Sequence, residues 1–473
     1  MSASQSVAPE ARLARHVARL DLNDVPVATR ERLLGLVHDI VACMLAGLRS
    51  PECARLAARA VRRGGVPEAS IVGSASRVPA ESAGFVNAAH AHWYEWDDVH
   101  DPGALHTGAV IFPVLLALAE ATEKEGGSAA GPAFMSACVG AFDIAGRLGE
   151  MLTPWSATAW MPTGAACTVG AAAGAARLLG LDEEGIRSAM GFGATAGGLS
   201  RQPLIDKVDG KNVLCAQSAS RAIEAALLAA DGLTGARHFL AGNYGLNQLY
   251  AGGRAEPSPA LDDLGRRYAL DEVSLKPYPC CRSAHPAIGV ALDLRAQEPT
   301  APGAIAGVEV SAPRPMYEMC GAPFRPGDNP RVSAQFSIAY TVAVALARGR
   351  VGLDDFDATR IGADFAILEL ARRIRTDPAV LAPGTTSLGQ PVTVRLTRND
   401  GSTIERTSSL VRGSPALPMS SAERSAKLAD AAHGVLTERE IDEISAAVAS
   451  VGEHGVTPIL RCLRAARRPT RGN

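Results

Sequence analysis

The sequence predicts a mostly helical protein with a smaller α+β domain in its second half. Up to about residue 250 the pattern is helical and rich in Ala and Leu, after about 270 it alternates as strands do, and from 421 to 451 it turns helical again. A chain of 473 residues is long enough for two or three domains. We therefore expect a helical domain at 1–270, an α+β lid domain at 271–409, and C-terminal helices at 410–473 that return to the helical domain.

Capping residues and glycines delimit the helices of the first half. A helix of small residues is expected over 163–179, ending at Gly180, and Asp182 can cap the helix that follows. Another helix is expected over 218–230, before Asp231-Gly232. Small residues let neighbouring helices approach closely, so this part of the chain should form a tightly packed bundle.

Strand signals mark the second half. Residues 305–310 have strand character, and 392–397 alternate with period two before Asn399-Asp400-Gly401, a strong hairpin turn signal. Residues 402–409 supply the return strand. Two helices are expected between these strands, at 333–348 and 358–373.

The charge balance argues against nucleic acid and membrane partners. Lys and Arg number 47 against 49 Asp and Glu, a net charge of −2 that gives no overall positive field. The uncharged stretch between Glu150 and Arg177 contains a GxxxG pair, Gly170 and Gly174, but it also contains prolines and is mostly alanine. We interpret it as a buried helix.

The cysteine pattern and the N-terminus favour a cytoplasmic protein. The nine cysteines are odd in number and scattered, with no CxxC pair, so the thiols are expected to be reduced. The first twenty residues carry charges where a signal peptide would need an apolar run.

The densest group of polar residues lies between His90 and Gly108, directly before an apolar helix signal at 109–119. It holds four of the ten histidines and four carboxylates. Histidines and carboxylates in one pocket can divide general acid and base work near neutral pH, and the start of a helix favours an anionic substrate. A metal site using His90 and His92 is a second interpretation. A capped, solvated loop without chemistry is the third.

Lysine usage gives an independent indication, because only five of the 47 basic residues are lysine. Three of them, Lys207, Lys211 and Lys276, fall in two short segments, where a compact or titratable ammonium group can be needed. The second segment, KPYPCCRSAHP, also carries Cys281 and Arg282 on a chain stiffened by proline. No phosphate-binding loop, dinucleotide fingerprint, GxSxG or HExxH motif appears, so no cofactor is expected.

Five blocks in order resemble the MmgE/PrpD family. They are HWYEWDDVHDPGALHTGAVIFPVLLALAE, GAAAGAARLLGLDEEGIRSAMG, KNVLCAQSASRAIEAALLAADGLTG, KPYPCCRSAHPAI and SAQFSIAYTVAVAL. The resemblance implies a large all-helical domain with an α+β lid, a homodimer, and cofactor-free and metal-free chemistry on small di- and tricarboxylates. Proteins similar in these blocks include 2-methylcitrate dehydratase, cis-aconitate decarboxylase and iminodisuccinate epimerase.

The resemblance also implies roles for single residues. His106 would handle the proton, with Asp97 and Asp98 as the acidic pair and His92 as the histidine that opens the motif. Lys211 and Lys276 would neutralise substrate carboxylates. The remaining residues expected to bind substrate are Glu95, Lys207, Arg282 and Cys281.

The chain departs from the family pattern at four positions. Glu95 stands where many members have Asp, Val99 where many have Thr, Met161 where a His is common, and Cys281 about where decarboxylase-like members have His. These departures disfavour cis-aconitate decarboxylation. A dehydratase-type lyase is therefore the first hypothesis, and the alternatives are an epimerase, a non-catalytic carboxylate-binding paralogue and a metalloenzyme.

Overall fold

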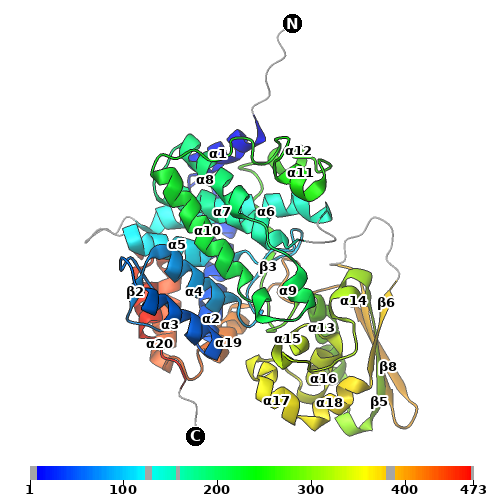
Figure 1. The fold of residues 1–473 in the computed structure, drawn as a ribbon. Coiled ribbons are helices and arrows are strands. Elements are labelled where there is room, and N and C mark those ends of the chain that lie inside the picture. Colours follow the sequence, from blue (N-terminus) through cyan, green and yellow to red (C-terminus); the bar gives the residue numbers. More distant parts are fainter. Residues whose placement is uncertain (1–7, 123–129, 156–159, 380–388, 470–473) are drawn as a thin grey trace.

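The computed structural model describes residues 8–122, 130–155, 160–379 and 389–469. It confirms the predicted fold class, a large helical part with a smaller domain built on one sheet (Figure 1). The larger part holds α1 (Pro9–Arg19), α2 (Val27–Gly47), α3 (Pro51–Arg63), α4 (Ala80–His92), α5 (Gly108–Thr122), α6 (Ala130–Leu152), α7 (Pro162–Leu178), α8 (Glu183–Ala196), α9 (Gln202–Ile205), α10 (Leu214–Ala230), α11 (Leu246–Ala251) and α12 (Ser258–Leu261). Two short ribbons join it, β1 (Ala69–Ser70) with β2 (Arg77–Val78), and β3 (Val99–His100) with β4 (Val273–Ser274).

Helix α7 lies at the centre of the helical part, packed against α5, α6, α8 and α10. Its glycines allow this: a Cβ on Gly170 would lie 2.5 Å from the Ala141 carbonyl oxygen of α6. Within the stretch interpreted as a buried helix, Pro162–Ala176 of α7 is buried. Among the residues that the structure describes, one helix, 209–230, is long and apolar enough to cross a membrane, and the helices 27–47 and 51–63 meet the same criterion only together, as a bent pair. The apolar side chains of α10, which makes up most of the helix 209–230, pack against α4, α7 and α8 inside the protein.

The predicted caps and helix ends hold in this region. Helix α7 is followed by Gly180 with φ of +77°, and Asp182 Oδ1 accepts a hydrogen bond from the Gly185 N–H at 2.8 Å, capping α8. Helix α10 begins at Leu214, four residues before the predicted start, and ends at Ala230 as expected.

The smaller domain contains one four-stranded sheet with the order β6-β5-β7-β8. Its elements are α13 (His285–Gln297), β5 (Ile305–Pro313), α14 (Arg314–Cys320), α15 (Pro330–Gln335), α16 (Ile338–Arg348), α17 (Ala358–Ala363), α18 (Phe365–Arg372), β6 (Ile374–Ala379), β7 (Val392–Arg398) and β8 (Thr403–Ser408). The hairpin of β7 and β8 turns at Gly401 with φ of +83°, as predicted. Helices cover one face of the sheet, between it and the helical part (Figure 1).

Both helices predicted between the strands are broken in two. The helix expected over 333–348 is interrupted after Gln335, where Ser337 accepts a hydrogen bond from the Tyr340 N–H and starts α16. The helix expected over 358–373 is interrupted at Asp364, which caps α18 in the same way. Strand β6 follows at once and pairs in parallel with β5, a pairing that no local pattern predicted.

The C-terminal helices lie against the first helices of the chain (Figure 1). They are α19 (Ser421–Ala432), α20 (Glu438–Ala449), α21 (Val451–His454) and α22 (Thr457–Ala465), and both α19 and α20 pack on α2. Their buried Leu428, Ile444 and Leu460 join the apolar core of the helical part, whereas the sheet and its helices form a second core. The domain limits 1–270, 271–409 and 410–473 stay a prediction.

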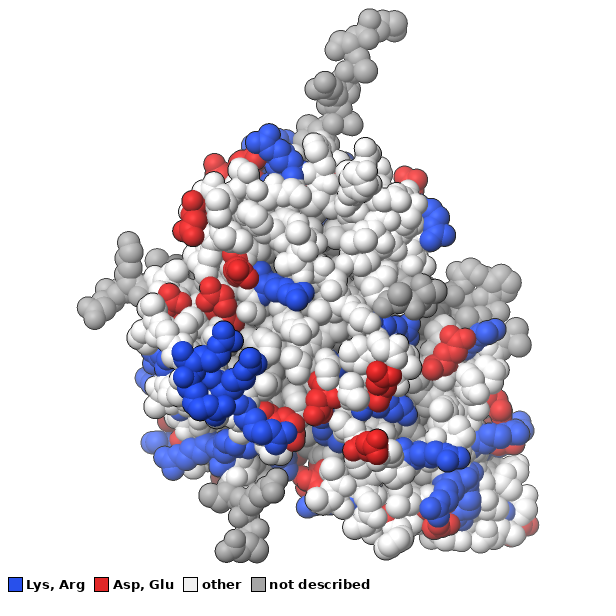
Figure 2. All heavy atoms as spheres, in the orientation of Figure 1, with Lys and Arg blue, Asp and Glu red and all other residues white. Residues whose placement is uncertain are grey.

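Charges of both signs are scattered over the face shown in Figure 2. A group of arginines gathers over α3, where Arg55, Arg59, Arg62 and Arg63 are exposed.

Short 3-10 turns lie between the longer elements: η1 (Thr153–Trp155), η2 (Asp209–Lys211), η3 (Ala269–Glu272), η4 (Arg282–Ala284), η5 (Pro302–Ala304) and η6 (Leu353–Phe356).

Candidate active site

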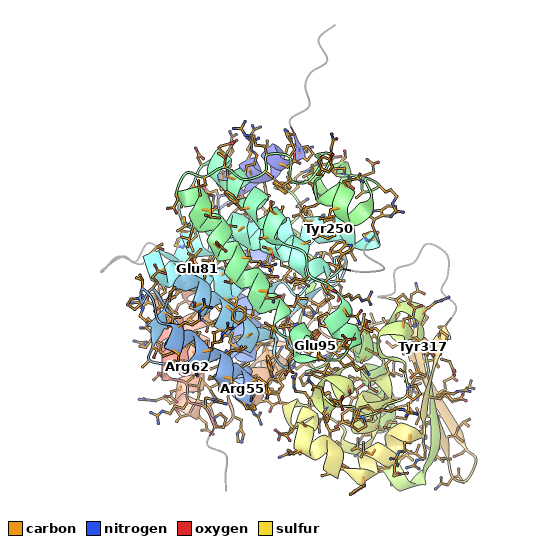
Figure 3. The ribbon with its side chains drawn as sticks, in the orientation of Figure 1. Arg55, Arg62, Glu81, Glu95, Tyr250 and Tyr317 are labelled. Atoms are coloured by element: carbon orange, nitrogen blue, oxygen red, sulfur yellow. The ribbon has the colours of Figure 1, made fainter. Side chains whose placement is uncertain are left out.

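The polar segment predicted from the sequence forms a buried loop between two core helices. His92 is the last residue of α4, and His106 lies two residues before the start of α5. Between them β3 pairs with β4, and this pairing brings Lys276 to the loop. Figure 3 shows Glu95 of this loop where the helical part and the smaller domain meet.

Side chains from distant parts of the chain fix this loop by binding four consecutive carbonyl oxygens. Asn212 and Arg331 donate to the carbonyl of Trp93, at 2.9 and 2.8 Å, and Gln335 donates to that of Tyr94 at 2.7 Å. The ammonium groups of two lysines complete the set: Lys276 donates to the carbonyl of Glu95 at 2.9 Å and Lys427 to that of Trp96 at 2.7 Å. Buried carbonyl groups need such donors, so the loop has one well-defined conformation.

Asp97 links the two histidines through its two carboxylate oxygens. Oδ1 lies 3.0 Å from Nδ1 of His92, and Oδ2 lies 2.8 Å from Nδ1 of His106. Burial opposes ionisation of Asp97, but His92, His106 and Lys276 outweigh it and hold its pKa well below the usual range. An ionised Asp97 accepts hydrogen bonds only, so each imidazole donates from Nδ1 and keeps Nε2 for other partners.

The two histidines differ in what their Nε2 atoms face. Nε2 of His92 lies 2.9 Å from the Lys211 ammonium, and this ring is completely buried. Burial lowers the pKa of His92 well below its usual value, which favours a neutral ring that accepts from Lys211. The side chain of His106 keeps 12% exposure, and its Nε2 lies 3.5 Å from Glu95 Oε1. His106 is therefore the imidazole of this pair that a substrate can reach.

Glu95 lies among the cationic groups of the cluster. Its carboxylate pairs with Lys211, and its Oε1 is 3.1 Å from the Lys276 ammonium. Burial and, after it, the Lys276 charge hold the pKa of Lys211 well below its usual value. The structure thus brings together six predicted residues: His92, Glu95, Asp97, His106, Lys211 and Lys276.

Asp98, the second member of the predicted acidic pair, faces away from the imidazoles. Its carboxylate accepts from the Gly108 N–H at 2.9 Å and from the Thr107 hydroxyl, so it caps the start of α5. A Cβ on Gly108 would lie 2.2 Å from Asp98 Oδ1, which explains the glycine at this position. Burial, helped by the Asp97 charge, raises the pKa of Asp98 to about 6.

Three further predicted residues lie outside the cluster. Arg282 is held by Asp101, at 3.2 and 3.0 Å, and by the Arg412 carbonyl. Cys281 is buried beside Cys320, and the hydrogen bond from that thiol lowers the pKa of Cys281 to about 6. Lys207 is partly exposed, has a left-handed backbone with φ of +54°, and acts electrostatically on Cys320. Among the contacts of the described residues, none joins these three side chains to His92 or His106.

Sequence reasoning missed the supporting residues. Lys427 pairs with Asp39 of α2 at 2.7 Å, both completely buried, directly behind the loop. The scarcity of lysine was a signal that could have singled it out. Thr163 was a further miss: its hydroxyl accepts from the His106 backbone N–H at 3.1 Å, so the start of α7 positions the histidine.

The histidines and Asp97 also form the group that could hold a metal ion, with ligand atoms within 4.8 Å of one another. A divalent cation there would lie close to the ammonium group of Lys211, which repels it. His90, the other histidine of the metal interpretation, instead donates from Nδ1 to the Val86 carbonyl on its own helix at 2.8 Å. The donor set therefore fits proton chemistry better than metal binding.

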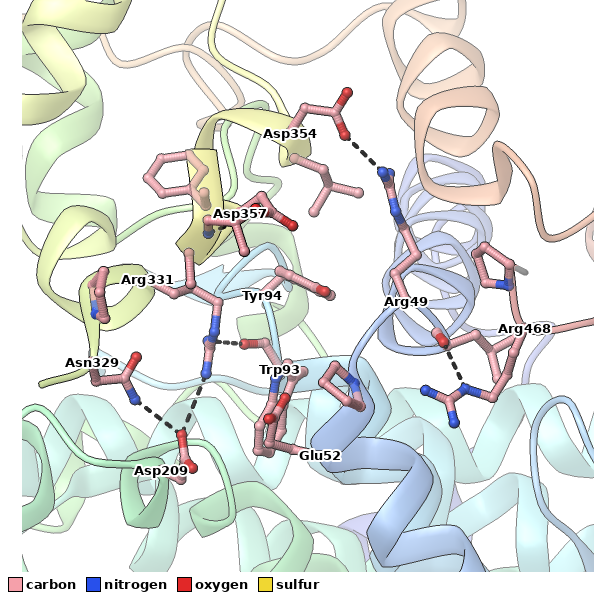
Figure 4. A pocket seen from close by; sticks show the side chains of 18 of the residues that line it. Arg49, Glu52, Trp93, Tyr94, Asp209, Asn329, Arg331, Asp354, Asp357 and Arg468 are labelled. Carbon is pink, nitrogen blue, oxygen red and sulfur yellow. Dashed lines mark hydrogen bonds and ion pairs between the residues drawn. The ribbon is translucent and has the colours of Figure 1, made fainter. Parts of the chain in front are cut away.

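A cavity of about 540 Å³ is lined by Trp93 and Tyr94, which stand between His92 and Glu95 in the sequence (Figure 4). Arg49 pairs with Asp354 across it at 2.7 Å, and Arg331 lies over the Trp93 ring at 5.2 Å. Arg331 also pairs with Asp209 of the lining at 3.5 Å, and none of the six clustered residues lines the cavity.

An imidazole pair that shares one carboxylate, next to two buried lysines, can carry out acid–base chemistry on an anion. The MmgE/PrpD N-terminal domain model matches residues 11–258, and the MmgE/PrpD C-terminal domain model matches 278–451. The chain belongs to the MmgE/PrpD family.

Individual relatives in the family are distant. The chain is 28% identical to a cis-aconitate decarboxylase-like protein, oryM, of Aspergillus oryzae, over 75% of this chain and 76% of that protein. It is 24% identical to a cis-aconitate decarboxylase of Aspergillus terreus over 96% of this chain and 95% of that protein. The human cis-aconitate decarboxylase is 28% identical over 44% of this chain and 43% of its own length.

Proposed function

We propose that this protein is a cofactor-independent lyase that moves a proton next to a carboxylate of a small di- or tricarboxylate, with dehydration as its reaction. The observation that carries the proposal is the arrangement around Asp97, which holds both imidazoles by Nδ1 and leaves Nε2 of His106, the partly exposed imidazole, facing the Glu95 carboxylate at 3.5 Å. Family membership and the names of the decarboxylase relatives support a lyase in general.

His106 supplies the acid and base chemistry in this proposal. A neutral imidazole that donates from Nδ1 to an ionised carboxylate is a better base at Nε2, because Asp97 stabilises the imidazolium that forms. Removing a proton next to a carboxylate builds enolate-like charge, and the ammonium groups of Lys211 and Lys276 can stabilise that charge. The imidazolium can then return the proton to the departing hydroxyl group, so that water leaves.

Two alternatives differ in the fate of that proton. An epimerase would return a proton to the opposite face of the same carbon and needs a second donor, for which Lys211 is the candidate. A decarboxylase is favoured by the names of the relatives and disfavoured by Met161, Val99 and Cys281. A homodimer and a site without resident metal are carried over from the family resemblance as part of the proposal, and a cytoplasmic location is carried over from the cysteine pattern and the N-terminal residues.

A substrate panel in deuterated water tests the reaction class. The purified protein is incubated with hydroxylated and unsaturated di- and tricarboxylates, while ultraviolet absorbance follows double bonds and NMR follows deuterium. A dehydratase interconverts the hydroxy acid and the alkene, whereas deuterium exchange without a change in absorbance indicates an epimerase, and released carbon dioxide indicates a decarboxylase. Tight binding without any exchange across the panel would overturn the enzyme proposal, and activity lost with EDTA and restored by a metal would overturn metal-free chemistry.

A further inference from the structure

The Glu95 carboxylate contacts every other charged or imidazole group at the centre of the cluster except Asp97. It pairs with Lys211 and Lys276, and it lies 3.7 Å from Nε2 of His92 and 3.5 Å from Nε2 of His106. Three of these groups, Lys211, Lys276 and His106, are the ones that the proposed function assigns to the substrate. A carboxylate of the protein therefore lies where a carboxylate of the substrate is expected.

Both the backbone and the side chain of Glu95 are held in this position. Its backbone has a left-handed φ of +56°, which is costly for a residue other than glycine or asparagine, and the Lys276 ammonium binds its carbonyl as well as its side chain. The residue is 2% exposed. Neighbouring carbonyls are fixed by Arg331, Gln335 and Lys427, so the backbone cannot easily turn the side chain away.

Side-chain length matters here. An aspartate at this position would be shorter by one carbon–carbon bond, about 1.5 Å, and would withdraw its charge from the space between the two lysines. With glutamate, one of the two ammonium charges is already balanced by the protein. A further anionic group of a substrate would meet a repelling carboxylate instead of a free cation.

We infer that Glu95 determines substrate specificity: its carboxylate takes the place between Lys211 and Lys276 that one substrate carboxylate would otherwise take, so the site selects dicarboxylates over tricarboxylates. This inference rests on the proposed function and narrows its substrate class. Glu95 acts by exclusion and charge balance, and the proton transfer stays with His106.

A matched pair of unreactive ligands tests the inference by binding alone. Tricarballylate and glutarate share one carbon skeleton and differ by the central carboxylate. Their dissociation constants are measured by titration calorimetry, at one pH and low ionic strength, for the wild type, Glu95→Gln and Glu95→Asp. Glu224→Gln is the matched control, because Glu224 is exposed on α10, away from the cluster.

The wild type and the control should bind glutarate more tightly than tricarballylate. Glu95→Gln should shift the ratio of the two constants toward tricarballylate by about tenfold or more, and Glu95→Asp should shift it in the same direction. If Glu95→Gln lacks a cooperative melting transition, the charge-conserving Glu95→Asp decides the matter. Thermal melts of all forms identify that case.

Three other outcomes would contradict the inference. An unchanged ratio in both variants, or a wild type that already prefers tricarballylate, would overturn the inference and leave the proposed function intact. Loss of proton exchange in Glu95→Gln with an unchanged ratio would assign Glu95 to the proton transfer instead. Absence of binding of both ligands to every form would overturn the proposed substrate class as well.

Discussion

His106 is the residue on which the proposed chemistry depends most directly. Asp97 holds its Nδ1, Thr163 accepts from its backbone N–H, and the side chain keeps 12% exposure. We expect His106→Ala to lower kcat by about 10² to 10⁴ in the proton-exchange assay. The fold should remain intact, because this side chain is not part of the apolar core.

The matched control for this prediction is His433→Ala, since His433 is exposed at the end of α19. It should exchange protons at the wild-type rate. Wild-type turnover in His106→Ala, with melting unchanged, would move the proton chemistry to His92 or Asp97.

Asp98 should make stability depend on pH. Because burial and Asp97 raise its pKa to about 6, the folded chain keeps a proton that the unfolded chain releases near pH 4. The contribution is thus fully present below about pH 4 and is lost as the pH rises to about 6, on the order of 1–3 kcal/mol of unfolding free energy. Asp98→Asn retains an oxygen acceptor for the Gly108 N–H and has no such titration.

Urea unfolding of wild type and Asp98→Asn at several pH values between 4 and 7 measures this effect. The difference in unfolding free energy should move in favour of the variant between about pH 4 and pH 6 and stay level above that. Other titrating groups occur in both proteins and cancel. A difference that does not change with pH would show that Asp98 ionises at its ordinary pKa.

At the scale of elements, the loop after α4 depends on a buried ion pair. Lys427 of α19 binds the Trp96 and Lys276 carbonyls as well as Asp39 of α2. Lys427→Met would leave the Asp39 carboxylate buried without its cation, so we expect a loss of about 3–5 kcal/mol in unfolding free energy.

Chemical denaturation of the single variants Lys427→Met and Asp39→Asn and of the double variant checks this coupling. Removing both charges should cost clearly less than the sum of the single losses. Additive losses would mean that the two side chains do not stabilise each other, and that the carbonyl contacts alone account for the effect of Lys427.

The elements that could be predicted from the sequence are those with local signals. Helix α7 with Gly180, the Asp182 cap and the turn at Gly401 each depend on residues within a few positions of one another. The break after Gln335 depends on distant contacts, because the Gln335 side chain binds the carbonyls of Tyr94 and Pro279. Strand β6 contains Asp377 and Pro378, poor strand formers, and is a strand because β5 pairs with it.

The same distinction applies to the site. The histidines and Asp97 are close in sequence, and the rarity of lysine singled out Lys211 and Lys276, so the cluster could be predicted. That Asp98 is a helix cap, and that Glu95 lies between the lysines, depends on side-chain direction within a loop that distant donors hold in shape. No spacing rule encodes that direction.

The whole molecule has two apolar cores, and this division has a consequence for unfolding. One core contains the helices with α19–α22, and the other contains the sheet with α13 and α16. The chain passes between them near residue 278 and again near residue 410, and Arg282 links the two passages through Asp101 and the Arg412 carbonyl. The smaller core is bounded by strand β8, whose side chains are mostly exposed.

We therefore expect two unfolding transitions, with the sheet domain unfolding first, because it has the smaller core and an open sheet edge. Val394→Ala, in the sheet core, should destabilise only the first transition, by about 2 kcal/mol, and Val139→Ala, in α6, only the second by a similar amount. Both valines are fully buried, so the two variants are matched controls for each other. Calorimetry measures the transitions, and hydrogen exchange by mass spectrometry assigns them to segments. A single transition that both variants shift equally would show that the two cores unfold as one unit, and that the site at their junction is no more mobile than either core.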